Sequence, residues 1–73
     1  MEFFFIITLL YPGYSGANYL TRKGTVTAKP GETRQDLHNK VLVSIHNSVD
    51  DPGIRHANVV FFSLEINELP VTV

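Results

Sequence analysis

The residues from Phe3 to Leu10 read FFFIITLL, and this run decides the fold. It is too short to span a bilayer, which takes about 20 apolar residues, because Pro12–Gly13 follows directly after Tyr11. We expect no signal peptide either, since Glu2 stands where such a signal carries basic residues. A continuous apolar run that ends at a turn signal is typical of a strand buried on both faces. Residues 2–11 are therefore predicted to form the central strand of a sheet.

The segment that follows predicts a hairpin. Residues 11–16 read YPGYSG, and Pro followed by Gly favours a type II turn, because Gly accepts a positive φ. A second strand, rich in Thr, is expected over residues 17–29. Gly24 inside that strand is interpreted as a bulge, and Pro30–Gly31 as the end of the strand. Two strands joined by a short turn pair antiparallel.

A helix is predicted next, beginning near Thr33. Thr33 followed by Asp36 matches a capping box, in which the Thr hydroxyl accepts a hydrogen bond from the backbone N–H three residues on. Residues 50–53 read DDPG, a turn cluster that ends the helix, and Val43 falls on its outer face. Apolar residues recur every four positions along the opposite face, which we expect to pack on the sheet. They are Leu37, Val41 and Ile45, flanked by Leu42 and Val49.

A third strand is predicted over residues 57–69 by the clearest period-two alternation in the chain. One face carries Val60, Phe62, Leu64 and Ile66, and the other carries Val59, Phe61, Ser63, Glu65 and Asn67. A right-handed crossover through the helix places the first strand in the middle, in the order 2-1-3. Because 73 residues allow one domain, we predict a single α+β domain over residues 1–73. Its three-stranded, mostly antiparallel sheet (β-β-α-β) carries one helix on one face.

One helix cannot cover both faces of this sheet, yet the first strand is apolar on both. The sequence leaves open which parity of that strand faces the helix. With its odd-numbered residues inward, the uncovered apolar residues are Phe4, Ile6, Leu10, Val59 and Phe61. A contiguous exposed apolar surface marks an interaction site, for self-association or for a protein partner. The alternative is that the loop over residues 11–18, with Tyr14 and Tyr19, folds over this face. The third strand could also pair edge to edge with a second copy across a two-fold axis.

The residues from Val26 to Val41 resemble a segment of the ubiquitin-like β-grasp family. Two apolar positions, a Pro, a capping Thr and two apolar helix positions recur at similar offsets. In this chain they are Val26, Ala28, Pro30, Thr33, Leu37 and Val41. The match covers roughly a third of the chain, and only one strand follows the helix where the family has two or more. The tail at residues 69–73 reads LPVTV and lacks the family's Gly-Gly end. The resemblance therefore implies a binding module, without conjugation or sulfur-carrier chemistry.

The chemistry-bearing residues indicate neither a cofactor nor catalysis. The chain has no cysteine, so disulfides and thiolate metal sites are excluded. His38 and His46 are eight positions apart, and adjacent metal ligands on a helix need four, while His56 lies across a loop. Asp50–Asp51 suit a turn rather than a carboxylate pair. Ser15 lies in a hairpin loop and not at the strand-to-helix turn of a nucleophile elbow. We therefore expect no metal, no cofactor, no small-molecule substrate and no enzymatic activity.

The net charge favours one of the two remaining functions, protein interaction, over the other, nucleic-acid binding. Six basic and seven acidic residues give a net charge of −1, which provides no footprint for nucleic acid or for an anionic membrane. The leading hypothesis is a cytoplasmic, non-catalytic protein-interaction module that forms a homodimer or binds another protein. A stand-alone chain of this size also suits a phage- or plasmid-borne regulator or inhibitor of a host protein. The alternative is a nucleic-acid-binding module that uses Arg22, Lys23, Lys29 and Arg34.

Overall fold

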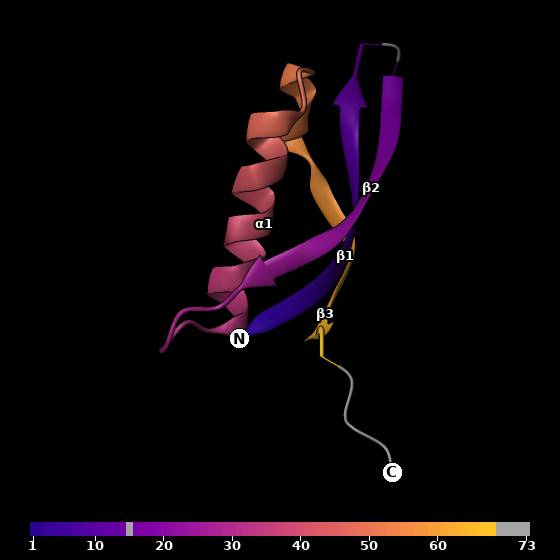
Figure 1. Cartoon of the computed structure of the whole chain (residues 1–73). Helices are drawn as coiled ribbons and strands as arrows, with labels where there is room; N and C mark the ends of the chain where they lie inside the picture. Colours follow the sequence, from indigo (N-terminus) through magenta and orange to yellow (C-terminus); the bar gives the residue numbers. More distant parts are fainter. Residues whose placement is uncertain (15, 69–73) are drawn as a thin grey trace.

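A computed structural model describes residues 1–14 and 16–68 of the chain. The strands are β1 (Glu2–Gly13), β2 (Gly16–Thr27) and β3 (Asn58–Ile66), and the helices are α1 (Arg34–Ser48) and the short 3₁₀ helix η1 (Pro52–His56). The sheet has the order β2-β1-β3, and both pairs of strands are antiparallel. Helix α1 lies along one face of the sheet, and no other element of the described residues lies over the opposite face (Figure 1). The predicted fold class and strand order are confirmed.

The core shows which alternate residues of β1 face the helix, a choice that the sequence leaves open. Ile7 and Leu9 are buried almost completely, so the odd-numbered residues of β1 face the helix. They pack against the predicted stripe of α1, and Val43 on the outer face of the helix is 56% exposed. The buried helix residues are Leu37, Val41 and Ile45. Even-numbered residues of β1 therefore lie on the face that α1 leaves open.

The hairpin between β1 and β2 is longer and tighter than the sequence predicts. We expected Pro12–Gly13 to belong to a turn, but β1 continues through both residues, and Gly13 pairs with Gly16. Gly16 adopts a positive φ of 114°, which suits glycine. Pro12 is tolerated because β3 begins opposite Leu10, so no third strand needs the N–H group that proline lacks.

The bulge of the sheet lies in β3 and not at Gly24, where we expected it. The register between β1 and β2 runs without interruption, and Gly24 lies opposite Phe5. A Cβ atom on Gly24 would stand 3.4 Å from the Phe5 ring, so the ring occupies the space beside the glycine. Opposite Thr8 and Leu9, the register of β3 shifts by one residue, which leaves Val60 without a partner on β1.

Helix α1 begins with the capping box that the sequence predicts. The Asp36 N–H donates to Thr33 Oγ1 at 3.2 Å, and the Thr33 N–H donates to Asp36 Oδ2 at 2.9 Å. These bonds satisfy backbone donors that have no partner inside the helix. The helix then runs to Ser48, where Val49 ends it in an extended conformation.

The segment after α1 contains a core residue that sequence reasoning missed. Instead of a simple turn, Pro52–His56 forms η1, which Asp51 caps by accepting from the Gly53 N–H at 2.9 Å. Ile54 in η1 is 1% exposed and packs into the same core as Ile7 and Leu9. A Cβ atom on Gly53 would stand 1.6 Å from the carbonyl oxygen of Pro12. Glycine at this position therefore lets η1 pack directly on the far end of β1.

Candidate functional site

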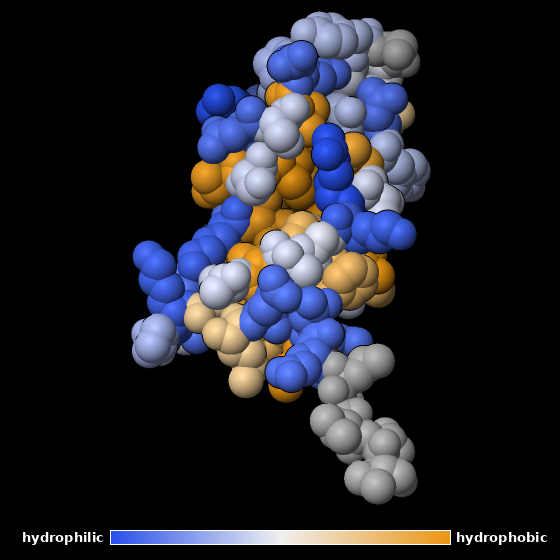
Figure 2. Space-filling view, in the orientation of Figure 1, coloured by the Kyte–Doolittle hydropathy of each residue, from blue (hydrophilic) through white to orange (hydrophobic). Residues whose placement is uncertain are grey.

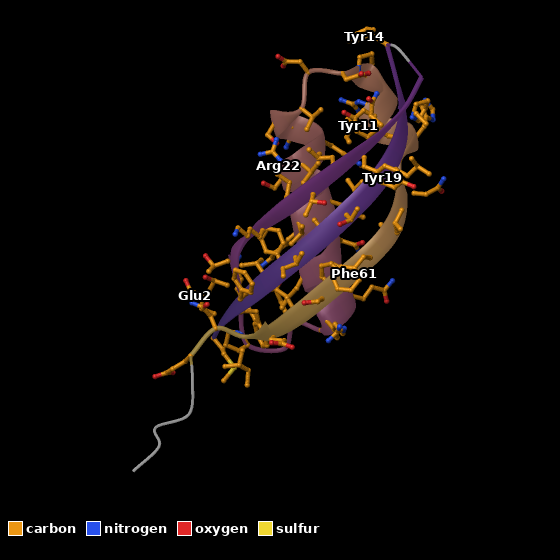
Figure 3. The ribbon with its side chains drawn as sticks, turned by 90° about the vertical axis from the view of Figure 1, so that its right-hand side faces the viewer. Glu2, Tyr11, Tyr14, Tyr19, Arg22 and Phe61 are labelled. Carbon is orange, nitrogen blue, oxygen red and sulfur yellow. The ribbon has the colours of Figure 1, made fainter. Side chains whose placement is uncertain are left out.

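Within residues 1–14 and 16–68, no element lies over the face of the sheet opposite α1. The centre of this face is an even-numbered stripe of β1, whose side chains are only half-buried. The neighbouring strands contribute the residues opposite that stripe, and we call the whole set the open face. It comprises Phe4, Ile6, Thr8 and Leu10 of β1, Tyr19, Thr21, Lys23 and Thr25 of β2, and Asn58, Phe61, Ser63 and Glu65 of β3. Figure 3 looks onto this face, with α1 behind the sheet.

Exposure and polarity are unevenly distributed over the open face. Tyr19 is 71% exposed and Phe61 is 52% exposed, so two aromatic rings stand out at its flanks. Thr8 and Thr21 share a hydrogen bond between their hydroxyl groups at 3.0 Å, which ties the central strand to β2. The surface thus combines a half-buried apolar stripe with exposed aromatic rings and hydroxyl groups, a mixture that is common in protein interfaces.

Four of the five predicted interface residues lie together on the open face. Phe4, Ile6 and Leu10 form its central stripe, and Phe61 lies opposite Thr8. Val59 does not belong to the set, because the bulge at Val60 brings it opposite Leu9, whose side chain faces the helix. A strict alternation along β3 would have kept Val59 beside Phe61. The bulge is a tertiary feature that the alternating pattern does not reveal.

The sequence predicts Tyr19 within the second strand but does not assign it to the interface, and the structure places it on the open face. Tyr19 pairs with Leu10, and the residues around it form an unbroken ladder from Tyr11–Asn18 to Gly13–Gly16. The alternative in which residues 11–18 fold over the open face is therefore wrong for the described residues. The alternation of Tyr19, Thr21 and Thr25 along β2 was the signal that could have found this position.

The third strand is a poorer edge for pairing than we expected. Arg34 of α1 donates from Nη1 to the carbonyl oxygen of Leu64 at 3.5 Å, and its guanidinium lies 5.9 Å from the centre of the Phe62 ring. The His38 ring packs edge-on against the same Phe62 ring at 4.6 Å. Arg34, through the Leu64 carbonyl, and the bulge at Val60 thus obstruct the outer edge of β3.

The four cations of the nucleic-acid hypothesis do not share one surface. Arg22 lies opposite Ile7 and Lys23 lies opposite Ile6, so their side chains leave β2 on opposite faces. Lys29 follows the end of β2, and Arg34 is engaged at the edge of β3. A groove that follows a phosphate backbone needs such cations on one side.

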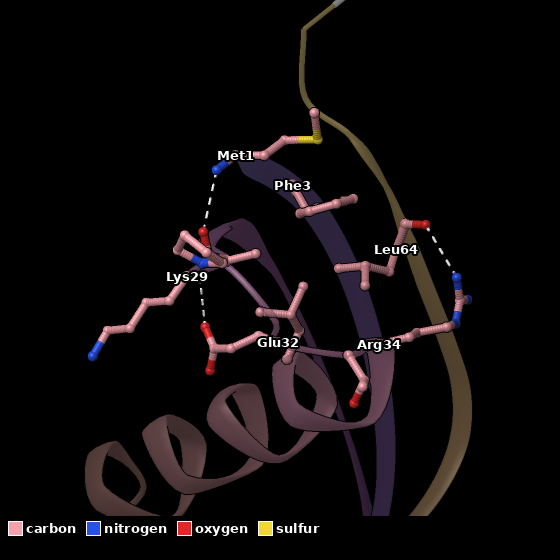
Figure 4. A pocket seen from close by; sticks show the side chains of 10 residues that line it. Met1, Phe3, Lys29, Glu32, Arg34 and Leu64 are labelled. Atoms are coloured by element: carbon pink, nitrogen blue, oxygen red, sulfur yellow. Dashed lines mark hydrogen bonds between the residues drawn. The ribbon is translucent and has the colours of Figure 1, made fainter.

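An open hollow of about 330 Å³ lies between the first turn of α1 and the ends of β1 and β3. Figure 4 shows Met1, Phe3 and Leu64 around it, with Glu32 and Arg34 at its rim. The Lys29 N–H donates to Glu32 Oε1 at 2.7 Å, and Lys40 Nζ forms an ion pair with the same oxygen. These bonds lower the pKa of Glu32, which favours a fixed carboxylate over a proton-transfer group.

The histidines are distributed over separate parts of the fold. His38 lies against Phe62, His46 is in the last turn of α1 and His56 is in η1. Within residues 1–14 and 16–68, no three His, Cys, Asp or Glu side chains are grouped so that they could hold a metal ion. Ser15, which the sequence predicts to lie in a hairpin loop, is outside the described residues.

Comparisons of the chain with models of known protein families, with curated proteins and with solved structures find no match. The small antiparallel sheet with one helix is compatible with a β-grasp-like arrangement. The strand that follows the helix is β3 alone in the described part of the chain, and residues 69–73 lie outside it. Among the described helices, none has the length and apolar character needed to cross a membrane.

Proposed function

We propose that the chain is a non-catalytic protein-interaction module that forms a homodimer through its open face. The observation that carries this proposal is the apolar stripe of Phe4, Ile6 and Leu10, beside exposed Tyr19 and Phe61, over which no element of the described part of the chain packs. Burying apolar surface gains roughly 25 cal/mol for each Å², so a second copy on this face would be stabilised. The same proposal places the module in the cytoplasm and includes a β-grasp-like structural class.

The size of the open face sets the expected strength of the dimer. Three strands about 4.8 Å apart and about 30 Å long give a face on the order of 400 Å². Stable protein interfaces bury about 800 Å² on each partner, roughly twice as much. We therefore expect a reversible dimer whose population rises with concentration, and not an obligate one.

Phe61→Glu tests the proposal, because it places a charge within the proposed interface, beside the apolar stripe of β1. We expect the mass in solution, measured by light scattering after gel filtration, to fall from dimer to monomer over a concentration series. Val43→Glu is the matched control, since Val43 is 56% exposed on the opposite side of the molecule and Phe61 is 52% exposed. The control should keep the mass of the wild-type chain. A wild-type chain that is monomeric at every concentration would refute the proposal.

The nucleic-acid alternative gains no support from the geometry, because Arg22 and Lys23 point to opposite faces of β2. It still predicts retention on a DNA or RNA column at low salt, lost steeply as salt rises. Passage of the chain through both columns without retention would remove this alternative.

A further inference from the structure

The backbone of β2 has one side that the sheet does not use. Ala28 N–H donates to the Met1 carbonyl at 2.8 Å, and the Met1 nitrogen donates to the Ala28 carbonyl at 3.2 Å. Bonded pairs alternate with non-bonded pairs along an antiparallel ladder. Since the register from this pair to Gly13–Gly16 is unbroken, even-numbered residues of β2 bond to β1. The N–H and C=O groups of its odd-numbered residues therefore point away from the sheet.

An independent contact agrees with this assignment. Lys40 Nζ of α1 donates to the carbonyl oxygen of Thr27 at 3.2 Å, so that odd-numbered residue presents its carbonyl to the outer side. Beyond Thr27, no described residue outside the ladder bonds to the backbone of the remaining odd-numbered positions of β2. These positions, which we call the free edge, are Ala17, Tyr19, Thr21, Lys23 and Thr25.

The two outer strands of the sheet differ in how well they are protected. On β3 the bulge and Arg34 obstruct the edge, as described above. The free edge of β2 spans nine residues, roughly 30 Å, with no proline and no bulge. Proteins protect an edge of this kind by a bulge, a proline, a covering element or charged side chains, and between Ala17 and Thr25 only charged side chains, Arg22 and Lys23, are present. The outward backbone groups of this edge therefore stay able to bind an added strand.

The charge of β2 indicates what kind of segment can bind at the free edge. The strand from Gly16 to Thr27 carries Arg22 and Lys23 and no acidic residue, and both cations are exposed. A second copy paired antiparallel about Thr21 would bring two Arg22 and two Lys23 side chains close to the two-fold axis. Like charges on adjoining strands are destabilising, whereas opposite charges there contribute favourably. The edge therefore suits an extended segment with two successive acidic residues.

We propose that β2 binds an extended, acidic segment of a partner protein by adding it as a fourth strand beside Ala17–Thr25. This inference rests on the proposed protein-interaction function and adds a second surface with a stated partner chemistry. Backbone hydrogen bonds to the odd-numbered residues would hold the segment. Its two acidic side chains would face Arg22 on the helix side and Lys23 on the open face. Figure 2 shows hydrophobic residues exposed along the seam between α1 and β2, bordered by hydrophilic ones, so the helix does not close over this side.

The test is a titration of the ¹⁵N-labelled full chain with a capped peptide of about eight residues, Thr-Val-Thr-Glu-Glu-Val-Thr-Val. We expect the amides of Tyr19, Thr21 and Lys23 to shift and to exchange more slowly with solvent, while Leu20 and Arg22 change less. A peptide with Lys-Lys in place of Glu-Glu should not bind. Unchanged edge amides, or equal binding of the basic peptide, would overturn the proposal.

Two pairs of variants separate the contribution of backbone hydrogen bonds to peptide binding from the contribution of charge. Thr21→Pro removes one outward N–H group and should weaken the affinity for the acidic peptide about tenfold. Thr21→Ala keeps this N–H group and should change the affinity less than about threefold. Lys23→Glu should weaken binding roughly fivefold, while Lys29→Glu, with the same change in charge beyond the strand, should leave it unchanged. The charge pair remains informative if Thr21→Pro does not fold. Full binding by both Thr21→Pro and Lys23→Glu would refute the inference.

The titration also distinguishes the two proposals. If Phe61→Glu still binds the peptide, binding at the free edge of β2 is supported, whether or not the dimer dissociates. If Phe61→Glu dissociates the dimer but neither the wild-type chain nor any variant binds the peptide, the open-face dimer is supported and the binding of a strand at the free edge is refuted. If the amides of the free edge exchange more slowly when the chain is concentrated without peptide, a second copy occupies that edge. This result would overturn the proposal of an acidic partner segment.

Discussion

Gly53 shows how one residue can determine whether two distant segments meet. Its N–H donates to Asp51 at the start of η1, and the carbonyl of Pro12 occupies the place where its side chain would be. The neighbouring residue, Ile54, then enters the core. No positive φ is involved here, so the requirement for glycine comes from close approach of two backbones.

Gly53→Ala should therefore be strongly destabilising. A Cβ atom 1.6 Å from a backbone oxygen forces η1 away from β1, and we expect a loss of roughly 3 kcal/mol in the free energy of unfolding. Urea denaturation followed by circular dichroism measures this loss. Gly24→Ala is the matched control, because its Cβ would meet only the Phe5 ring at 3.4 Å. We expect the control to change stability by less than about 1 kcal/mol, and equal losses in both variants would contradict this account.

At the scale of the element, the start of α1 depends on two ionised carboxylates. Backbone hydrogen bonding from Lys29, and then the Lys40 side chain, lowers the pKa of Glu32 below its ordinary value of 4.5. The backbone N–H of Thr33, and then its side chain, lowers the pKa of Asp36 below its ordinary value of 3.8. Both groups lie at the positive end of the helix dipole, which also favours their charged forms.

These lowered pKa values predict a loss of stability in acid. A carboxyl group whose pKa is lower when folded stabilises the fold above its ordinary pKa, and this contribution is lost as pH falls through its folded pKa. The free energy of unfolding should thus begin to fall near pH 4.5 and continue to fall below pH 3.8. Urea denaturation at a series of pH values measures the slope. The Asp36→Asn variant should show a shallower slope, and an identical slope would count against the role of the capping box.

At the scale of the whole molecule, the two proposed surfaces should respond to salt in opposite ways. The dimer forms by burying the apolar stripe of Phe4, Ile6 and Leu10, whereas the free edge of β2 relies on Arg22 and Lys23. About 0.5 M sodium sulfate should strengthen apolar association, because this salt is excluded from protein surfaces. The same salt screens exposed charges and should weaken binding of the acidic peptide. Light scattering and the peptide titration, repeated in sulfate, measure both responses, and a dimer that dissociates in salt would contradict an apolar interface.

Much of the fold follows from local signals in the sequence. The capping box at Thr33 and Asp36 forms as predicted, because its groups are only three residues apart. The helix stripe and the strand order also agree with the patterns of apolar residues. Of the candidate site, Phe4, Ile6, Leu10 and Phe61 were found by the same alternation. Val59 was misplaced and Tyr19 was missed, because a bulge and an extended hairpin arise from pairing between strands.

The sequence by itself determined the three strands and α1, their order and the surplus of apolar residues on β1, since these depend on side-chain periodicity and short-range hydrogen bonding. Only the tertiary structure decided which parity of β1 is buried, how far the hairpin extends and which edge of the sheet is free. The physical reason is that these features depend on contacts between segments distant in the chain. The carbonyl of Pro12 meets Gly53, Arg34 reaches Leu64, and Lys40 reaches Thr27, and no local pattern encodes such pairs.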